Sequence, residues 1–169
     1  LWQRPTRSNV GYADSFSLKT SDLIGSNDLI LFSNNKNQFY SLDVRTGSIN
    51  WKQKINSNLR ATLVGDLIFT ITLEGFLVVV NKENGNVIRS TDIFAKLSEK
   101  TRSKIEPIGF IVGADKIYLT TSNGRLFVVD ILTGRTISIF KIDNKKLSRP
   151  FVLNQNLFII EKNSIIKLN

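Results

Sequence analysis

Short apolar segments separated by polar turns recur along the chain in one fixed order. Each copy begins with a run rich in β-branched and aromatic residues, at 29–32, 67–73, 117–121 and 157–160. A polar turn and a second alternating run follow, at 39–42, 76–80, 126–129 and 165–168. Third runs lie at 49–55, 87–93 and 136–142, and shorter apolar pieces precede the copies at 22–25, 61–65, 108–113 and 150–153. Runs of this length between turn residues predict β-strands.

The strand pattern is an internal repeat. Three copies start at Asp28, Asp66 and Asp115, and a shorter fourth starts at Asn156. Four short strands in about 40 residues are typical of a β-propeller blade. We therefore predict an all-β fold, a β-propeller of four-stranded antiparallel blades with about four blades present. The blades are expected at 20–56, 60–94, 107–143 and 149–169, with an insertion at 95–106 and no outer strand in the last blade.

Helix is expected only around the insertion. In the segment DIFAKLSEKTR, Asp92 could cap one or two helical turns, with Ile93, Phe94 and Leu97 on one face. The chain starts at Leu1 and contains no Met, so we expect it to be a piece of a longer product. Half of an eight-bladed ring, a fragment and a small closed ring all fit the repeat count.

Two columns of the repeat define a tight turn. Asx residues and glycines recur four positions apart, at Asp43 and Gly47, Asn81 and Gly85, and Asp130 and Gly134. An Asx side chain accepts backbone N–H groups two residues on, and Gly supplies the positive φ of a bulged hairpin loop. The six residues are predicted to turn the chain. A general base or metal ligand is disfavoured, because the column recurs in every complete blade and Asn replaces Asp in one.

Trp51 lies four residues after the first of these glycines. The same column holds Arg89 and Ser138 in the other complete copies, so the aromatic residue is particular to one blade. We predict that Trp51 packs between neighbouring blades. Leu1 and Trp2 match the end of the same outer strand.

Composition excludes several kinds of site. The chain has no Cys and no His, which rules out Cys and Cys–His zinc sites, disulfides and Ser-His-Asp triads. No apolar run approaches the about 18 residues of a membrane helix. We predict no catalytic, cofactor-binding or metal-binding residues.

The net charge is +9, from 23 basic and 14 acidic residues. The densest basic patches contain acids or adjoin them and have no interleaved aromatic residues: Lys96, Lys100, Arg102 and Lys104, and Lys141, Lys145, Lys146 and Arg149. A surface that binds nucleic acid would combine clustered charge with stacking aromatics. We therefore do not expect a nucleic-acid partner.

The turn motif FYSLDVRTGSINW, with weaker copies LVVVNKENGNVIR and LFVVDILTGRTIS, resembles the PQQ-like (quinoprotein-type) propeller repeat family. The order of motif, insertion and shortened last blade resembles the C-terminal half of the BamB family. That resemblance implies a periplasmic, outer-membrane-associated lipoprotein that takes part in outer-membrane protein assembly. Its implied partner is the barrel subunit of the assembly machinery, and no cofactor is implied.

The function predicted on this basis is a non-enzymatic protein-interaction scaffold. Candidate partner contacts are loop residues without a turn role: Arg4, Arg7, Tyr12 and Phe16. A quinoprotein dehydrogenase fragment is one alternative, although such enzymes hold PQQ over a Trp with adjacent Cys residues and calcium. An adaptor or sensor propeller of another system is a second. Open blade edges also favour self-association, with the gap filled by a second copy, by Leu1 and Trp2, or by a missing half.

Overall fold

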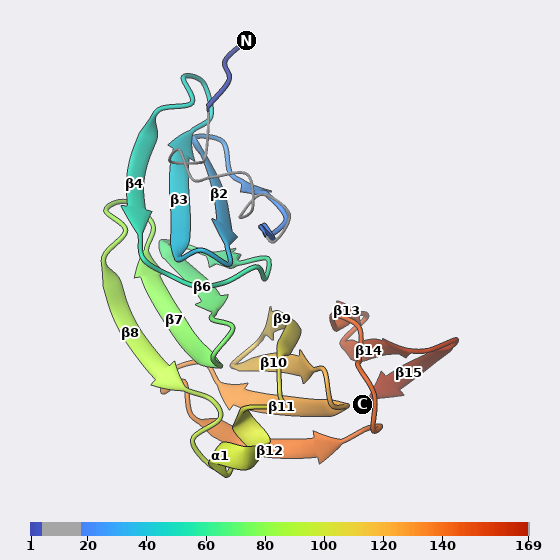
Figure 1. The fold of residues 1–169 in the computed structure, drawn as a ribbon. Coiled ribbons are helices and arrows are strands. Elements are labelled where there is room, and N and C mark those ends of the chain that lie inside the picture. Colours follow the sequence, from blue (N-terminus) through green and yellow to red (C-terminus); the bar gives the residue numbers. More distant parts are fainter. Residues whose placement is uncertain (5–17, 169) are drawn as a thin grey trace. The chain divides into compact units, whose positions relative to one another are not determined.

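The computed structural model describes residues 1–4 and 18–168. Figure 1 shows these residues as strands, with a single helical turn between β8 and β9. The first two sheets contain β1 (Ile24–Gly25), β2 (Leu29–Asn34), β3 (Gln38–Asp43), β4 (Ile49–Gln53), β5 (Thr62–Val64), β6 (Leu67–Ile71), β7 (Phe76–Asn81) and β8 (Val87–Asp92). The others contain β9 (Pro107–Gly113), β10 (Lys116–Thr121), β11 (Arg125–Asp130), β12 (Thr136–Lys141), β13 (Phe151–Leu153), β14 (Asn156–Glu161) and β15 (Ser164–Leu168).

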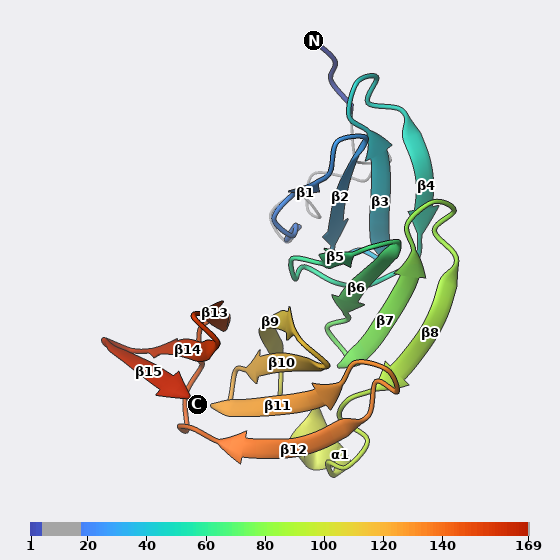
Figure 2. The ribbon, with the colours of Figure 1, turned by 180° about the vertical axis from the view of Figure 1, so that it is seen from behind.

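The strands form four sheets in chain order. Three sheets have four strands, β1-β2-β3-β4, β5-β6-β7-β8 and β9-β10-β11-β12, and the last has three, β13-β14-β15. Figure 2 shows the short first strands β1 and β5. We call these sheets the first to fourth blades. The all-β fold of up-and-down antiparallel blades is as predicted. The first strands β1, β5 and β13 have two or three residues, whereas β9 has seven.

The chain divides into two compact units, Leu1–Thr70 with Val79–Ile88 and Ile71–Val78 with Arg89–Asn169. In the first unit, β2 and β3 pair with Leu31 opposite Ser41. Leu31 and Phe39 are fully buried there, and the rings of Phe32 and Tyr40 stack with centroids 5.1 Å apart. Four consecutive residues of β3 are buried, so both faces of this strand are covered.

The second unit has its own apolar core. Leu126, Leu147, Leu157 and Ile159 form a buried cluster, with Tyr118 packed against it. Leu147 comes from the connection between β12 and β13, so the connection itself contributes to the packing.

The insertion differs from its prediction. Helix α1 spans only Glu99–Arg102, and its N-cap residue is Ser98, so the prediction that Asp92 caps the helix is wrong. Asp92 ends β8 and its Oδ1 accepts the backbone N–H of Phe94 at 2.8 Å, an Asx turn. Ile93 and Phe94 are buried before the helix starts. Burial of these two side chains holds the segment in turns instead of a helix, because local helix propensity is a weak prior beside tertiary packing.

Candidate functional site

Three hairpin corners join the third strand of a blade to its outer strand, and their geometry is the same. In the first corner (Asp43–Gly47), Asp43 Oδ1 accepts the backbone N–H of Thr46 at 2.7 Å and its hydroxyl at 2.9 Å. The N–H of Gly47 donates to the carbonyl of Asp43 at 2.9 Å. Gly47 has φ +70°, a conformation that other residues adopt at a cost.

The second corner (Asn81–Gly85) repeats the bonds from backbone N–H groups, and the third (Asp130–Gly134) repeats the hydroxyl bond as well. Asn81 Oδ1 accepts the N–H groups of Glu83 and Asn84 at 2.9 and 3.1 Å. Asp130 Oδ1 accepts the N–H and the hydroxyl of Thr133, each at 2.7 Å. The structure therefore places the Asx and Gly residues of all three copies in tight turns.

The two corner aspartates have lowered pKa values. The backbone N–H of Thr46, followed by its hydroxyl, holds the pKa of Asp43 below its ordinary value of 3.8. The hydroxyl of Thr133, followed by its N–H, does the same for the pKa of Asp130. Hydrogen bonds to the charged form stabilise it, so these carboxylates remain ionised acceptors within their own turns.

Each of the first two corners receives a tryptophan. Trp51 Nε1 donates to the carbonyl of Lys82 at 2.9 Å, and a Cβ placed on Gly85 would overlap the Trp51 ring. Trp2 Nε1 donates to the carbonyl of Val44 at 3.1 Å, and its ring lies in the same way against Gly47. The acceptor is in both cases the residue after the corner Asx. We call this combination of carbonyl and glycine a corner socket.

The third corner socket receives Arg89 instead. Its guanidinium donates to the carbonyls of Ile131, at 2.7 Å from Nη2, and of Leu132. Thr91 fills the space against Gly134. Sequence comparison placed Arg89 in the Trp51 column but assigned it no role. The signal that could have revealed this role is that Trp and Arg side chains both carry N–H donors on a flat group.

The two tryptophans differ in how far they are covered. Trp51 is 8% exposed, because Phe39 of its own blade packs edge-on against it with ring centroids 5.6 Å apart. Trp2 is 37% exposed. Packing of Phe39 against the indole ring therefore distinguishes the buried Trp51 from the partly exposed Trp2.

Where the Trp51 column holds Ser138, the face beside it is open. Ser138 pairs with Val128, and Val128 lines an apolar groove with a volume of about 250 Å³. The groove lies between strands of the third and fourth blades, within the second unit, and is lined by Tyr118, Leu126, Val128, Phe140, Ile142, Gln155, Leu157 and Leu168. Ser138, the smallest residue of the column, is thus the cross-strand neighbour of a residue that lines the groove.

Of the four predicted partner contacts, the structure describes only Arg4, which is exposed. Arg7, Tyr12 and Phe16 lie outside the described residues. The exposure of Arg4 does not test whether it contacts a partner, so its role stays a prediction.

Basic residues of the two predicted patches are partly engaged within the protein. Arg102 of α1 forms an ion pair with Asp92 at 2.8 Å, and Lys96 Nζ donates to the carbonyl of Thr136 at 3.0 Å. Lys141 Nζ donates to the carbonyl of Asn123 at 3.2 Å. These three cations therefore have partners within the protein.

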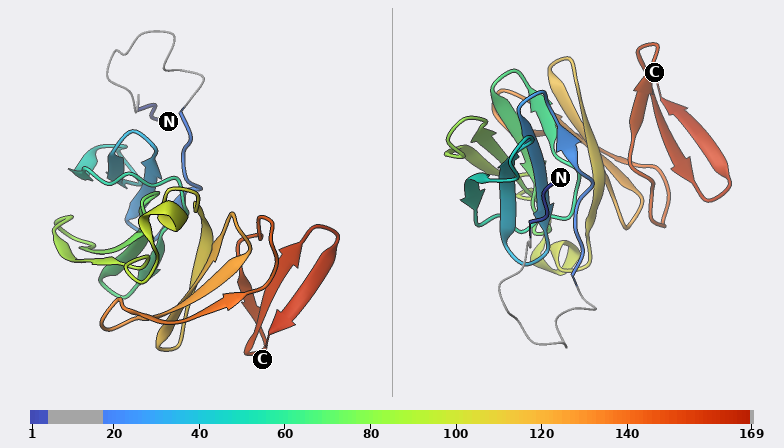
Figure 3. Two further views of the ribbon diagram at one scale, coloured as in Figure 1. Left: turned by 60° about the horizontal axis from the view of Figure 1, so that its bottom comes forward. Right: turned by 90° about the horizontal axis from the view of Figure 1, so that it is seen from above.

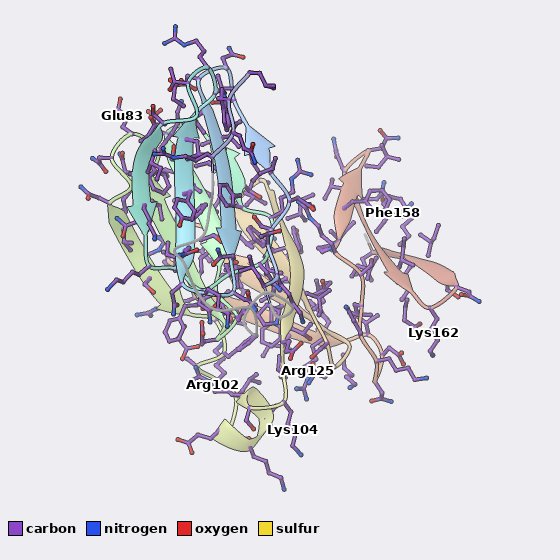
Figure 4. All side chains as sticks on the ribbon, turned by 45° about the horizontal axis from the view of Figure 1, so that its top comes forward. Glu83, Arg102, Lys104, Arg125, Phe158 and Lys162 are labelled. Carbon is purple, nitrogen blue, oxygen red and sulfur yellow. The ribbon has the colours of Figure 1, made fainter. Side chains whose placement is uncertain are left out.

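A mixed charge cluster lies at the tip of the fourth blade. Lys162, labelled in Figure 4, lies 2.8 Å from Glu161 and 3.6 Å from Asp143. Glu161 raises the pKa of Lys162, and the Asn144 backbone N–H, ahead of other groups, lowers the pKa of Asp143. Among the described residues no group of three Asp, Glu, His or Cys side chains could hold a metal ion. Within residues 1–4 and 18–168, no helix is long and apolar enough to cross a bilayer.

Comparison with known proteins identifies the architecture. A family model described as "Outer membrane protein assembly factor BamB" matches residues 1–91. BamB from Moraxella catarrhalis superposes with a TM-score of 0.70 at 14% identity, over 87% of this chain and 41% of that one. The chain thus spans about two fifths of that BamB. No curated protein matches the sequence.

Two further structures share the fold. The computationally designed Ika4 protein gives a TM-score of 0.66 at 11% identity, over 88% of this chain and 89% of that one. The quinohemoprotein alcohol dehydrogenase ADHIIG from Pseudomonas putida HK5 gives 0.55 at 17% identity, over 70% and 20%. At these identities the likeness shows the fold alone, and it confirms the predicted β-propeller with about four blades.

Proposed function

Since the chain belongs to the family of the outer membrane protein assembly factor BamB, we propose that it is a non-enzymatic protein-interaction scaffold in outer-membrane protein assembly. The observation that carries this proposal is the match of the family model to residues 1–91. The same membership supports a periplasmic, outer-membrane-associated location with a lipoprotein anchor. The proposed partner is the barrel subunit of the assembly machinery.

The hydrogen bonds of the corner aspartates favour a scaffold over an enzyme. Asp43 and Asp130 recur at equivalent positions and are committed to hydrogen bonds within their own turns. A general base needs a carboxylate that is free to approach a substrate proton. The carboxylates of Asp43 and Asp130 instead accept hydrogen bonds within their own turns. Binding through loops and strand edges, by contrast, requires no special side-chain chemistry.

The partner contact is proposed to include Arg4, Arg7, Tyr12 and Phe16. The test measures binding of the purified chain to the purified barrel subunit by surface plasmon resonance. Replacing Arg4 and Arg7 together by Glu should weaken binding about tenfold or more, because reversing interfacial charges costs more than losing them. The matched control is the double replacement Lys54→Glu and Arg60→Glu, two exposed cations of the same unit.

The control variant should bind within about twofold of the unmodified chain. Absence of binding by the unmodified chain would contradict the scaffold proposal. Equal loss in both charge-reversal variants would instead show that net charge drives the association and would remove the assigned contact residues.

The alternative of a quinoprotein dehydrogenase fragment is favoured by one observation, the likeness to a quinohemoprotein alcohol dehydrogenase. Titration with PQQ and calcium, followed by tryptophan fluorescence, separates the two functions. The scaffold proposal expects no saturable change at micromolar PQQ. Stoichiometric binding would favour the enzyme. If the chain binds neither PQQ nor the barrel subunit, an adaptor propeller of another system becomes the better hypothesis.

A further inference from the structure

A second pocket lies within the second unit, where the end of β8 and the insertion after it meet the start of β12. Its volume is about 480 Å³, which is within the range of pockets that hold small-molecule ligands. Figure 3 shows the insertion, with its helical turn α1, from two directions. The pocket is formed by residues 91–96 and 135–136, far from both ends of the sequence, and its lining includes Thr91, Asp92, Ile93, Ala95, Lys96 and Arg135.

Hydrogen bonds hold the wall of this pocket in place. Thr136 Oγ1 donates to the carbonyl of Ile93 at 2.7 Å, and the Ile93 side chain is buried. The neighbouring Asp92 Oδ1 accepts the backbone N–H of Phe94 at 2.8 Å. These bonds link the start of the insertion to β12 and fix its first turn. The wall of the pocket is therefore formed before a ligand binds, which lowers the ordering cost of binding.

Positive charge exceeds negative charge in the pocket. Asp92 is the acidic residue of the lining, and it pairs with Arg102 of α1 at 2.8 Å. Lys96 Nζ uses one of its three N–H groups for the carbonyl of Thr136, at 3.0 Å. Arg135 is exposed. In the part of the chain that the structure describes, neither Lys96 nor Arg135 has a carboxylate partner, so two cations of the lining are not compensated by an acid.

The hydroxyl of Thr91 adds a third donor. Its Oγ1 lies 3.4 Å from the carbonyl of Thr133, which is longer than a normal bond between a hydroxyl and a carbonyl oxygen. It therefore gives up little when it turns toward a ligand in the pocket. Two cations and a hydroxyl around one space favour a ligand group with several acceptor oxygens.

The charge of the ligand group follows from the two cations. A phosphate monoester carries about −1.5 to −2 charges and three acceptor oxygens at pH 7, whereas a carboxylate carries one charge and two oxygens. Lys and Arg both bind phosphate oxygens through charge-assisted hydrogen bonds, which are about twice as strong as neutral ones. A phosphate monoester thus matches the lining in charge and in the number of hydrogen bonds.

We propose that this pocket binds the phosphate group of a small phosphate monoester. Lys96 and Arg135 contact the phosphate oxygens, and Thr91 donates a further hydrogen bond. The pocket exceeds a phosphate group in volume, so it leaves room beside Ala95 for the group that carries the ester. A soluble ester and the lipid phosphatidic acid present the same phosphate chemistry. This proposal is independent of the role in outer-membrane protein assembly, so either can fail alone.

Two measurements on the full chain test the ligand class and distinguish its sources. Isothermal titration calorimetry with glycerol 3-phosphate should show saturable binding, and glycerol should show none. Flotation with phosphatidylcholine vesicles compares added phosphatidic acid with added phosphatidylglycerol, whose phosphate is a diester. Binding of the soluble ester alone, or a preference for phosphatidic acid vesicles, supports the proposal and identifies the source. No binding of glycerol 3-phosphate together with no preference between the vesicles would overturn it.

A double replacement tests the two cations. Lys96→Gln with Arg135→Gln should weaken the binding at least about tenfold, because each cation contributes a charged hydrogen bond. The matched control is Lys116→Gln with Lys145→Gln, two exposed lysines of the same unit, which removes the same charge. The control should bind within about twofold of the unmodified chain, since distant surface charges are screened by salt. Equal loss in both variants would assign the binding to net charge and overturn the proposal.

Ala95→Glu tests the location without removing a polar contact. Ala95 is exposed and lines the pocket, so the replacement adds a negative charge at the proposed site. It should weaken binding at least about tenfold, because like charges placed side by side repel. Ala95→Gln has nearly the same size and no charge, and it should stay within about twofold of the unmodified chain. Circular dichroism verifies the fold of each variant, and unchanged affinity in folded Ala95→Glu would overturn the placement in this pocket.

Discussion

The second corner socket and the face beside Ser138 hold the same column of the repeat and differ in how well they are filled. At the second corner, Trp51 is buried, bonded to the carbonyl of Lys82 and packed by Phe39. Beside Ser138 there is a groove of about 250 Å³, and Phe140 on its wall is 52% exposed. Trp51 thus fills a corner of the next blade, whereas Ser138 has no such corner beside it among the described residues.

Arg89 shows that the column can be filled in a second way. It supplies N–H donors to the third corner as a tryptophan would, but its packing against Gly134 is taken over by Thr91. A donor and a flat surface are thus separable requirements. Trp51 meets both with one side chain, Arg89 and Thr91 share them, and Ser138 meets neither.

The largest effect is expected from replacing Trp51, which fills the second corner socket. Trp51→Ala should lower the free energy of unfolding of the first unit by about 3–5 kcal/mol, because it leaves a cavity where a buried indole packed. Trp51→Phe keeps an aromatic ring and loses chiefly the bond to Lys82, so its cost should be nearer ~1 kcal/mol. Urea unfolding followed by circular dichroism measures both.

Trp2 supplies the control for this experiment. Trp2→Ala removes the equivalent residue from a socket that is only half covered, and it should cost less than Trp51→Ala because less apolar area is buried. Equal costs at the two positions would show that the carbonyl bond, and not coverage by Phe39, sets the contribution of the tryptophan.

Much of this fold could be predicted because its signals are local. The alternation around Phe39 and Leu42 and the spacing of Asp43 and Gly47 specify strands and a turn within a few residues of chain. The short helix after Asp92 was misplaced for the opposite reason, since burial of Phe94 depends on residues distant in sequence. There Phe94 meets Phe127, with ring centroids 5.1 Å apart.

The candidate site was only partly predictable. The column of Trp51, Arg89 and Ser138 was visible in the repeat, but the shared carbonyl acceptor appears only when blades are side by side in space. The groove near Ser138 depends on how Phe140 and Leu168 are spaced, which no pattern along the chain encodes. Partner contacts such as Arg4 lie in segments with no repeat constraint, so the repeat carries no information about them.

A smaller effect is expected from adding apolar volume at Ser138, beside the groove. Ser138→Leu should stabilise the second unit by roughly 1 kcal/mol, because part of its side chain would be buried against the apolar lining of the groove. Ser138→Asn is the control, since it adds volume without apolar surface. Thermal unfolding measured by calorimetry should show a higher Tm for the leucine variant alone. A lower Tm for Ser138→Leu would mean that the groove closes too tightly to accept the side chain and that the column residue is already matched to its space.

The smallest effect concerns the corners themselves, where two copies have Asp and one has Asn. The folded-state pKa values of Asp43 and Asp130 lie below the ordinary value of 3.8, so their stabilisation is complete above that value and is lost as the pH falls through the folded-state pKa. The double variant Asp43→Asn, Asp130→Asn keeps an Oδ1 acceptor, as Asn81 does, but has no charge to lose. It should be slightly less stable than the unmodified chain at pH 7, and the difference should shrink below about pH 4. Asn81→Asp should create the same pH dependence at the second corner. Urea titrations at pH 7, 4 and 3 test both, and a difference that stays constant over this range would show that the corner charges contribute nothing beyond the turn geometry that Asn provides.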